Sequence, residues 1–132
     1  MLLQKNEKYK IFQTFDLVEF DGGQCSINHN RMYILQKMGV ELGYCFHRVD
    51  KGFCSNQLKE DLEDYFVCGQ YQRDIRDIVL TQDVDKCISK LFDIGENTPE
   101  LFTREQWFFN VARSLDGCGI LDVKKGDNDG TK

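Results

Sequence analysis

The spacing of apolar residues changes along this chain from a strand-like period to a helix-like one. Between Tyr9 and Phe20 the apolar side chains alternate between two faces, which is typical of a β-strand that is partly covered on both sides. The run Asp21-Gly22-Gly23 then provides residues that tight turns favour. From residue 55 onward the apolar residues recur at helical spacing. This order predicts an α+β fold in which about four helices pack on one face of a small N-terminal antiparallel sheet.

The clearest predicted helix follows Thr81. Its apolar residues recur at i, i+3, i+4, i+7 and i+8, and Gly95 is expected to end it. Another helix start is indicated by Thr103 and Gln106, which have the spacing of a capping box. The expected helices span residues 30–42, 55–68, 81–95 and 103–115. The expected extended segments span 24–26, 44–49 and 120–123, and residues 74–80 fit either a helical turn or a short strand.

The chain of 132 residues has the length of one ordinary domain, and no internal repeat or low-complexity segment divides it. We therefore expect a single domain over residues 1–123. Residues 124–132 contain no apolar side chain, so we expect a mobile polar tail there.

The apolar runs of the chain are those expected of a cytoplasmic protein. Leu2 and Leu3 do not form the apolar core of an export signal, and no apolar run approaches the roughly 18–20 residues that cross a bilayer. Thiols stay reduced in the cytoplasm, so the six cysteines are expected to be free. We expect a cytoplasmic location, which is the host cytoplasm for a phage-encoded chain, and no membrane partner.

Cysteine and histidine side chains concentrate between residues 25 and 54. They are Cys25, His29, Cys45, His47 and Cys54. Zinc prefers four such ligands, which makes a zinc site an alternative to the leading expectation of no cofactor. The one-residue gap between Cys45 and His47 is not typical of structural zinc sites, and no C-x2-C motif occurs. In the leading interpretation His29 is a surface turn residue and His47 a half-buried strand residue, while Cys87 belongs to the core.

A cysteine nucleophile is the second chemical hypothesis for the same region. Cys54 precedes a predicted helix, whose N-terminal dipole stabilises a thiolate, and Cys45 lies two residues from the candidate base His47. No family signature surrounds these residues, and the common phosphate-loop, dinucleotide, serine-hydrolase and zinc-protease motifs do not occur. The candidate catalytic residues of this alternative are therefore Cys54, Cys45 and His47.

Negative charge concentrates in the middle of the chain. Residues 51–96 hold ten acidic and six basic side chains, and the net charge of the whole chain is −5. A nucleic-acid-binding protein normally carries a basic stripe, so direct nucleic-acid binding is not expected. The acids of the predicted helix 55–68 are expected to face away from the core and to approach a basic protein partner, or else to serve solubility alone. These candidate partner-binding residues are Glu60, Asp61, Glu63 and Asp64.

An aromatic residue outside the apolar arc of the last helix gives a further hint. Phe109 lies beside Arg113 on the helical wheel, and exposed Phe and Arg residues are enriched at protein interfaces. Both are candidate partner-binding residues.

The chain is small, acidic and free of catalytic motifs, and in this profile it resembles the inhibitors and adaptors that phages and mobile elements encode. That resemblance implies a non-catalytic module that engages a basic surface of host nucleic-acid machinery through acidic residues. The alternative is a small zinc-binding or cysteine-dependent enzyme that uses the region Cys25 to Cys54.

Overall fold

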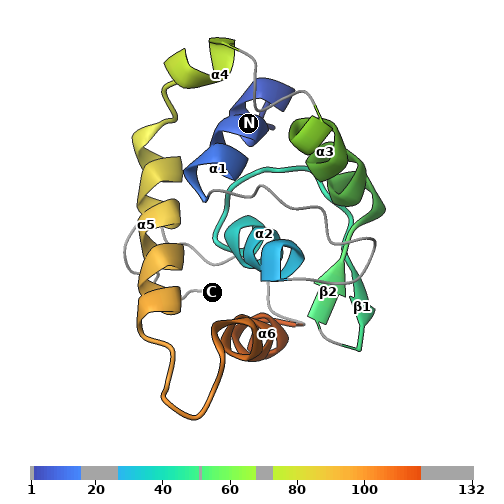
Figure 1. Cartoon of the computed structure of the whole chain (residues 1–132), viewed down its shortest axis with the longest axis vertical. Coiled ribbons are helices and arrows are strands. Elements are labelled where there is room, and N and C mark those ends of the chain that lie inside the picture. Colours follow the sequence, from blue (N-terminus) through green and yellow to red (C-terminus); the bar gives the residue numbers. More distant parts are fainter. Residues whose placement is uncertain (1, 16–26, 51, 68–72, 117–132) are drawn as a thin grey trace, which may run out of the picture.

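Helix α2 (Ile27–Lys37) is the centre of the fold. It is buried on more than one side and contacts helices α5 and α6 and strand β2. Figure 1 shows the other elements arranged around it. Its buried residues are His29, Asn30, Met32, Tyr33, Ile34 and Leu35. Two of these buried residues, His29 and Asn30, are polar, which explains why the amphipathic pattern of the helix is weak.

The computed structural model describes residues 2–15, 27–50, 52–67 and 73–116. Within them the elements are α1 (Lys5–Thr14), α2 (Ile27–Lys37), β1 (His47–Val49), β2 (Gly52–Cys54), α3 (Asn56–Val67), α4 (Arg73–Asp77), α5 (Gln82–Glu96) and α6 (Arg104–Ser114). The predicted α+β class with a small antiparallel sheet is confirmed, with more helices than expected. No helix in these described ranges has both the length and the apolar character needed to cross a membrane.

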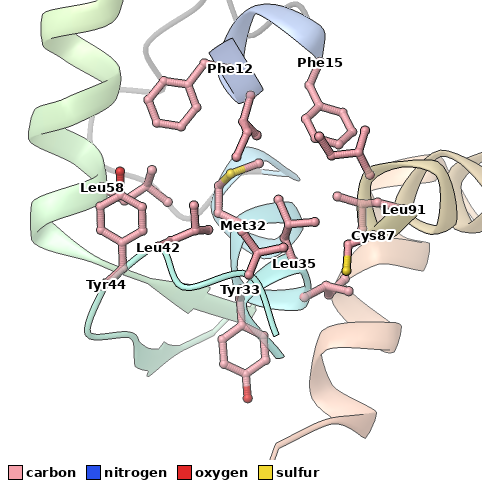
Figure 2. Close-up of a cluster of buried hydrophobic side chains, with 14 of the residues drawn as sticks. Phe12, Phe15, Met32, Tyr33, Leu35, Leu42, Tyr44, Leu58, Cys87 and Leu91 are labelled. Carbon is pink, nitrogen blue, oxygen red and sulfur yellow. The ribbon is translucent and has the colours of Figure 1, made fainter. Parts of the chain in front are cut away.

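The core forms where side chains from the surrounding helices meet α2. Phe12, Leu58 and Leu91 are fully buried and come from α1, α3 and α5. Figure 2 shows them around Met32 of α2. Cys87 is also fully buried, and its thiol lies 3.7 Å from the carbonyl oxygen of Met38, so its expected place in the core is confirmed.

The predicted N-terminal strand is wrong where the structure describes it, because Lys5–Thr14 forms helix α1. Apolar residues occur on both faces between Tyr9 and Phe15, so their alternation also fits a helix with a wide apolar arc. The carboxylate of Glu7 accepts a hydrogen bond from the backbone N–H of Gln4 at 2.7 Å, which stabilises the start of the helix. The rest of the predicted strand, the turn and the return strand at 24–26 lie outside the described residues.

The sheet of the described residues lies in the middle of the chain rather than at its N-terminus. Strands β1 and β2 pair antiparallel, and β1 falls within the expected extended segment 44–49. The side-chain oxygen of Asn30 accepts a hydrogen bond from the buried N–H of Phe53 at 3.1 Å, which ties the hairpin to α2. Gly52 has a φ of +127°, and a Cβ there would overlap the Asn30 side chain. The hairpin therefore needs glycine at this position.

The later helices follow their predicted starts closely. The Thr81 hydroxyl caps α5 by accepting from the Val84 N–H at 3.3 Å, and Thr103 and Gln106 form the predicted capping box of α6. Residues 73–77 adopt the helical alternative as α4. Gly95 does not end its helix as expected, because α5 continues to Glu96. The predicted segment 120–123 and the predicted tail 124–132 lie outside the described residues, and the single domain over 1–123 stays a prediction.

Candidate functional site

The outward face of α3 carries most of the acids that the sequence indicated. Glu60, Glu63 and Asp64 are exposed, and their spacing of i, i+3 and i+4 puts them on one face of the helix. Neither Glu60 nor Glu63 forms an ion pair within the part of the chain that the structure describes. Their charges are therefore not neutralised by a close cation of the described chain.

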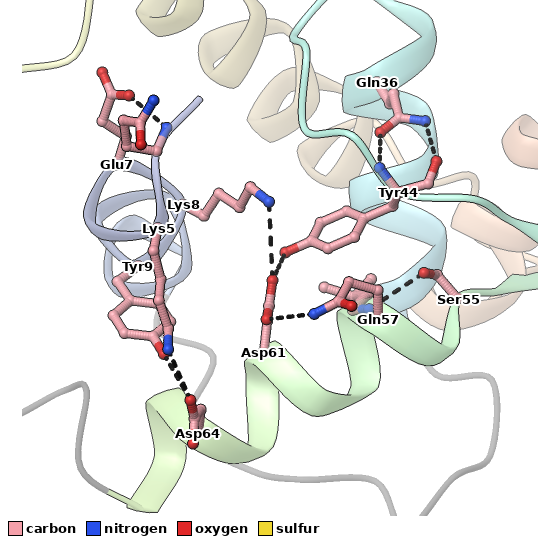
Figure 3. Close-up of polar contacts among 12 residues, drawn as sticks. Lys5, Glu7, Lys8, Tyr9, Gln36, Tyr44, Ser55, Gln57, Asp61 and Asp64 are labelled. Carbon is pink, nitrogen blue, oxygen red and sulfur yellow. Dashed lines mark hydrogen bonds and ion pairs between the residues drawn. The ribbon is translucent and has the colours of Figure 1, made fainter. Parts of the chain in front are cut away.

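Asp61 lies at the edge of the buried side of α3, and only 9% of it is exposed. Its carboxylate accepts hydrogen bonds from the Tyr44 hydroxyl at 2.6 Å and from the Gln57 amide at 3.0 Å. The ammonium of Lys8 lies 3.9 Å from the same carboxylate (Figure 3). The expectation that all four acids face away from the core is wrong for Asp61, because residue 61 falls at the edge of the arc that is buried against α1 and the segment before β1.

Tyr44 joins three parts of the fold in this network. Gln36 of α2 binds both backbone groups of Tyr44, since its amide donates to the carbonyl at 2.8 Å and its oxygen accepts from the N–H at 3.0 Å. Lys8 of α1 lies 4.6 Å from the centre of the Tyr44 ring. Burial, and then the hydrogen bond to Asp61, raise the pKa of Tyr44 far above its usual range. A tyrosine that stays protonated is suited to hold Asp61 in place and unsuited to proton transfer at neutral pH.

Asp64 has a partner from α1, but its carboxylate stays accessible. Lys5 Nζ lies 2.9 Å from this carboxylate, and more than half of each side chain is exposed. The hydrogen bond from Lys5 is the main cause that lowers the pKa of Asp64. Exposed ion pairs add little to stability, so a cationic partner is able to compete with Lys5 at small cost.

The C-terminal end of α3 adds apolar surface to its acidic face. Val67 lies at i+7 from Glu60 and is 68% exposed, and Phe66 beside it is 43% exposed. Phe66 is not buried with Leu62, because residue 66 lies about 90° around the helix from the centre of the buried arc. The face therefore combines carboxylates with large apolar side chains.

The second candidate surface, Phe109 with Arg113 on α6, is separate from α3. The Arg113 guanidinium lies 5.8 Å from the Phe109 ring centre, and Phe109 is half-buried. Figure 1 shows α6 and α3 on different sides of α2. The two sets of candidate partner-binding residues thus do not form one continuous surface.

His29 is placed differently from its expected surface turn. It lies in the central helix α2 and is only 2% exposed. Its Nδ1 accepts a hydrogen bond from the N–H of Ser55 at 3.2 Å, and the Ser55 hydroxyl in turn accepts from the Leu58 N–H at 3.2 Å. The imidazole therefore holds the start of α3 against α2, which is a structural role.

The remaining cysteine and histidine candidates lie on or next to the hairpin. Cys45 and His47 are exposed, so the expectation that His47 is half-buried is wrong, whereas Cys54 is buried opposite His47 in the strand register. Cys45, Cys54 and Cys87 are not disulfide-bonded. Cys25 lies outside the described residues, and within those residues no group of three or more His, Cys, Asp or Glu side chains is placed to hold a metal ion. The zinc alternative therefore has no described ligand set to support it.

Sequence analysis missed the residues that organise the network around Asp61. Tyr44 and Lys8 lie 17 and 53 positions away from Asp61, so no local pattern connects them. One sequence feature could have indicated the burial of Asp61. On a helical wheel of α3 it lies between the exposed acids and the apolar residues, and not among the acids.

Comparisons with protein-family models, with curated proteins and with solved structures gave no match to this chain.

Proposed function

We propose that this protein is a non-catalytic interaction module that binds a basic surface of a protein partner through the exposed face of α3. The observation that carries the proposal is the composition of this face. Glu60 and Glu63 are exposed without an ion pair among the described residues, and they adjoin the exposed side chains of Phe66 and Val67.

The two kinds of side chain on this face suit two stages of binding. Carboxylates that lack a close cation attract a basic surface over distances of about 8–10 Å at physiological salt. The C-terminal end of a helix carries partial negative charge, which adds to the field of Glu63 at that end of α3. Exposed Phe and Val side chains then provide the apolar contact that gives a complex its lifetime.

A nucleic-acid-binding protein is the partner class that this chemistry fits. Such proteins present clusters of Lys and Arg that bind phosphates, and carboxylates at the spacing of Glu60 and Glu63 compete for the same side chains. Binding of this kind makes the protein an inhibitor of nucleic-acid binding by its partner.

The first test compares affinity capture by the parent with capture by a doubly charge-reversed variant, Glu60→Lys with Glu63→Lys. Asp61 is left intact because its reversal would disrupt the buried network, and Asp64 because it pairs with Lys5. The matched control reverses Asp77 and Glu100, which are exposed acids outside α3, and changes the net charge equally.

We expect the parent and the control to retain the same basic protein and the α3 variant to lose it. A nucleic acid that is added to the complex should displace the parent, because the two ligands share one surface of the partner. Equal capture by all three proteins would contradict the proposal.

A further inference from the structure

Arg31 of α2 is enclosed by aromatic rings far from the acidic face of α3. Its guanidinium carbon lies 5.8 Å from the Phe15 ring centre and 5.2 Å from the Phe108 ring centre. Such cation–π contacts attract the guanidinium to the ring faces. They offset part of the hydration that the half-buried guanidinium loses.

This guanidinium has no carboxylate partner in the described chain. Its hydrogen bond with a protein group there runs from Nη1 to the side-chain oxygen of Asn28 at 3.4 Å, near the upper limit for such a bond. A guanidinium has five N–H donors, and a partly buried cation without a counter-charge is costly. Burial, and secondly the positive charge of Arg104, lower the pKa of Arg31. Arg31 thus lacks a directly bound counter-charge among the described residues.

Arg31 and Arg104 line the same pocket, which has a volume of about 130 Å³. Ligand sites for drug-sized molecules span about 300–1,000 Å³, so this pocket accommodates a small group rather than a whole cofactor. Arg104 is the first residue of α6, where the helix dipole adds further positive potential. The Phe92 ring, which is 44% exposed and lies 4.8 Å from Phe15 between ring centres, forms part of the same wall.

We propose that this pocket binds the phosphate group of a small phosphate monoester, with the organic part of the ester lying on Phe92. Two guanidinium groups from different helices line this pocket, and a phosphate has enough oxygens to accept hydrogen bonds from both, whereas a carboxylate has only two. The exposed ring of Phe92 then contributes apolar contact to the attached group. This binding site is separate from the acidic face of α3 and goes beyond the interaction function proposed above.

Glu96 lines the same pocket and opposes an incoming anion. It forms no ion pair with either arginine within the described residues, so it sits near the site without neutralising it. Removing its charge by Glu96→Gln should therefore strengthen phosphate binding. If Glu96 were instead the resident partner of the arginines, the same change would destabilise the fold and leave phosphate binding no tighter.

The test is a titration of the full chain with phenyl phosphate, inorganic phosphate and benzoate, followed by the NMR signals of the arginine Nε–H groups. Phenyl phosphate should shift the Arg31 and Arg104 signals most strongly, inorganic phosphate should act at the same signals with lower affinity, and benzoate should be weakest. Arg104→Gln should weaken phenyl phosphate binding about tenfold or more, because a charge-assisted contact is lost. Arg113→Gln on the same helix is the matched control and should have no effect.

Three further outcomes would overturn the proposal. They are unchanged Arg31 and Arg104 signals at millimolar phosphate, benzoate binding as tightly as phenyl phosphate, and an equal loss of affinity in Arg104→Gln and Arg113→Gln. Arg104 is exposed, so its substitution tests the site even if replacement of Arg31 prevents folding.

Discussion

Asp61→Ala should destabilise the fold far more than Glu60→Ala, although the two acids are neighbours in sequence. The Asp61 carboxylate accepts two hydrogen bonds, from Tyr44 at 2.6 Å and from Gln57 at 3.0 Å, and lies 3.9 Å from Lys8. Hydrogen bonds to a charged group contribute about 1.5–3 kcal/mol each, and their loss is not additive when water enters the gap. We expect a net loss of about 2–4 kcal/mol in the free energy of unfolding.

The assay is urea denaturation of the parent, Asp61→Ala and the exposed control Glu60→Ala, together with thermal melting. The expected loss corresponds to a fall of roughly 6–15 °C in Tm for a chain of this size. Tyr44→Phe removes the buried donor but keeps the ring, so a double-mutant cycle with Asp61→Ala should give a coupling energy of about 1–2 kcal/mol. Glu60→Ala should stay within about 0.5 kcal/mol of the parent, as exposed sites usually do. If Asp61→Ala and Glu60→Ala had equal stability, the network around Asp61 would not stabilise the fold as described.

Three further changes test other parts of the fold. Leu91→Ala should cost about 2–4 kcal/mol because the side chain is fully buried, and a melting curve like that of the parent would show that α5 is not packed as described. Gly52→Ala should lower the free energy of unfolding by at least about 2 kcal/mol, because a φ of +127° is strained for alanine and the methyl group would overlap Asn30. A urea denaturation midpoint equal to that of the parent would contradict this. The raised pKa of Tyr44 keeps its phenol neutral in the folded chain, whereas the unfolded chain ionises near pH 10, so stability should hold below about pH 10 and fall above it. Tyr44→Phe should flatten part of that alkaline decline, and an unaltered pH profile would show that Tyr44 ionises freely in the folded state.

Local patterns were sufficient to predict the helices whose signals are contained within a single segment. Helix α5 shows an apolar stripe from Val84 to Leu91 after the capping residue Thr81, and α6 begins with the capping box of Thr103 and Gln106. Helix α1 could not be distinguished from a strand because its apolar residues lie on both faces. The buried residues of the central α2 include the polar His29 and Asn30, so the spacing of its apolar residues does not indicate which faces are covered.

The candidate site shows the same division between local and long-range information. The exposure of Glu60 and Glu63 follows from the helical period of α3 alone. The burial of Asp61 depends on Tyr44 and Lys8, and the enclosure of Arg31 depends on rings from α1 and α6. Contacts between residues so far apart in the sequence depend on how the helices pack against each other. The spacing of apolar residues within one helix does not predict that packing.

The association rate with the captured partner tests the role of the α3 face most directly. It is measured for the parent, for Glu60→Lys with Glu63→Lys, and for the control at Asp77 and Glu100, each at low and at high salt. The screening length falls from about 30 Å at 0.01 M to about 3 Å at 1 M salt, so steering by Glu60 and Glu63 acts only at low salt. We predict that the α3 reversal slows association at least about tenfold at low salt and that the three rates converge at high salt. Rates that are insensitive to both the reversal and the salt would contradict a binding role for this face.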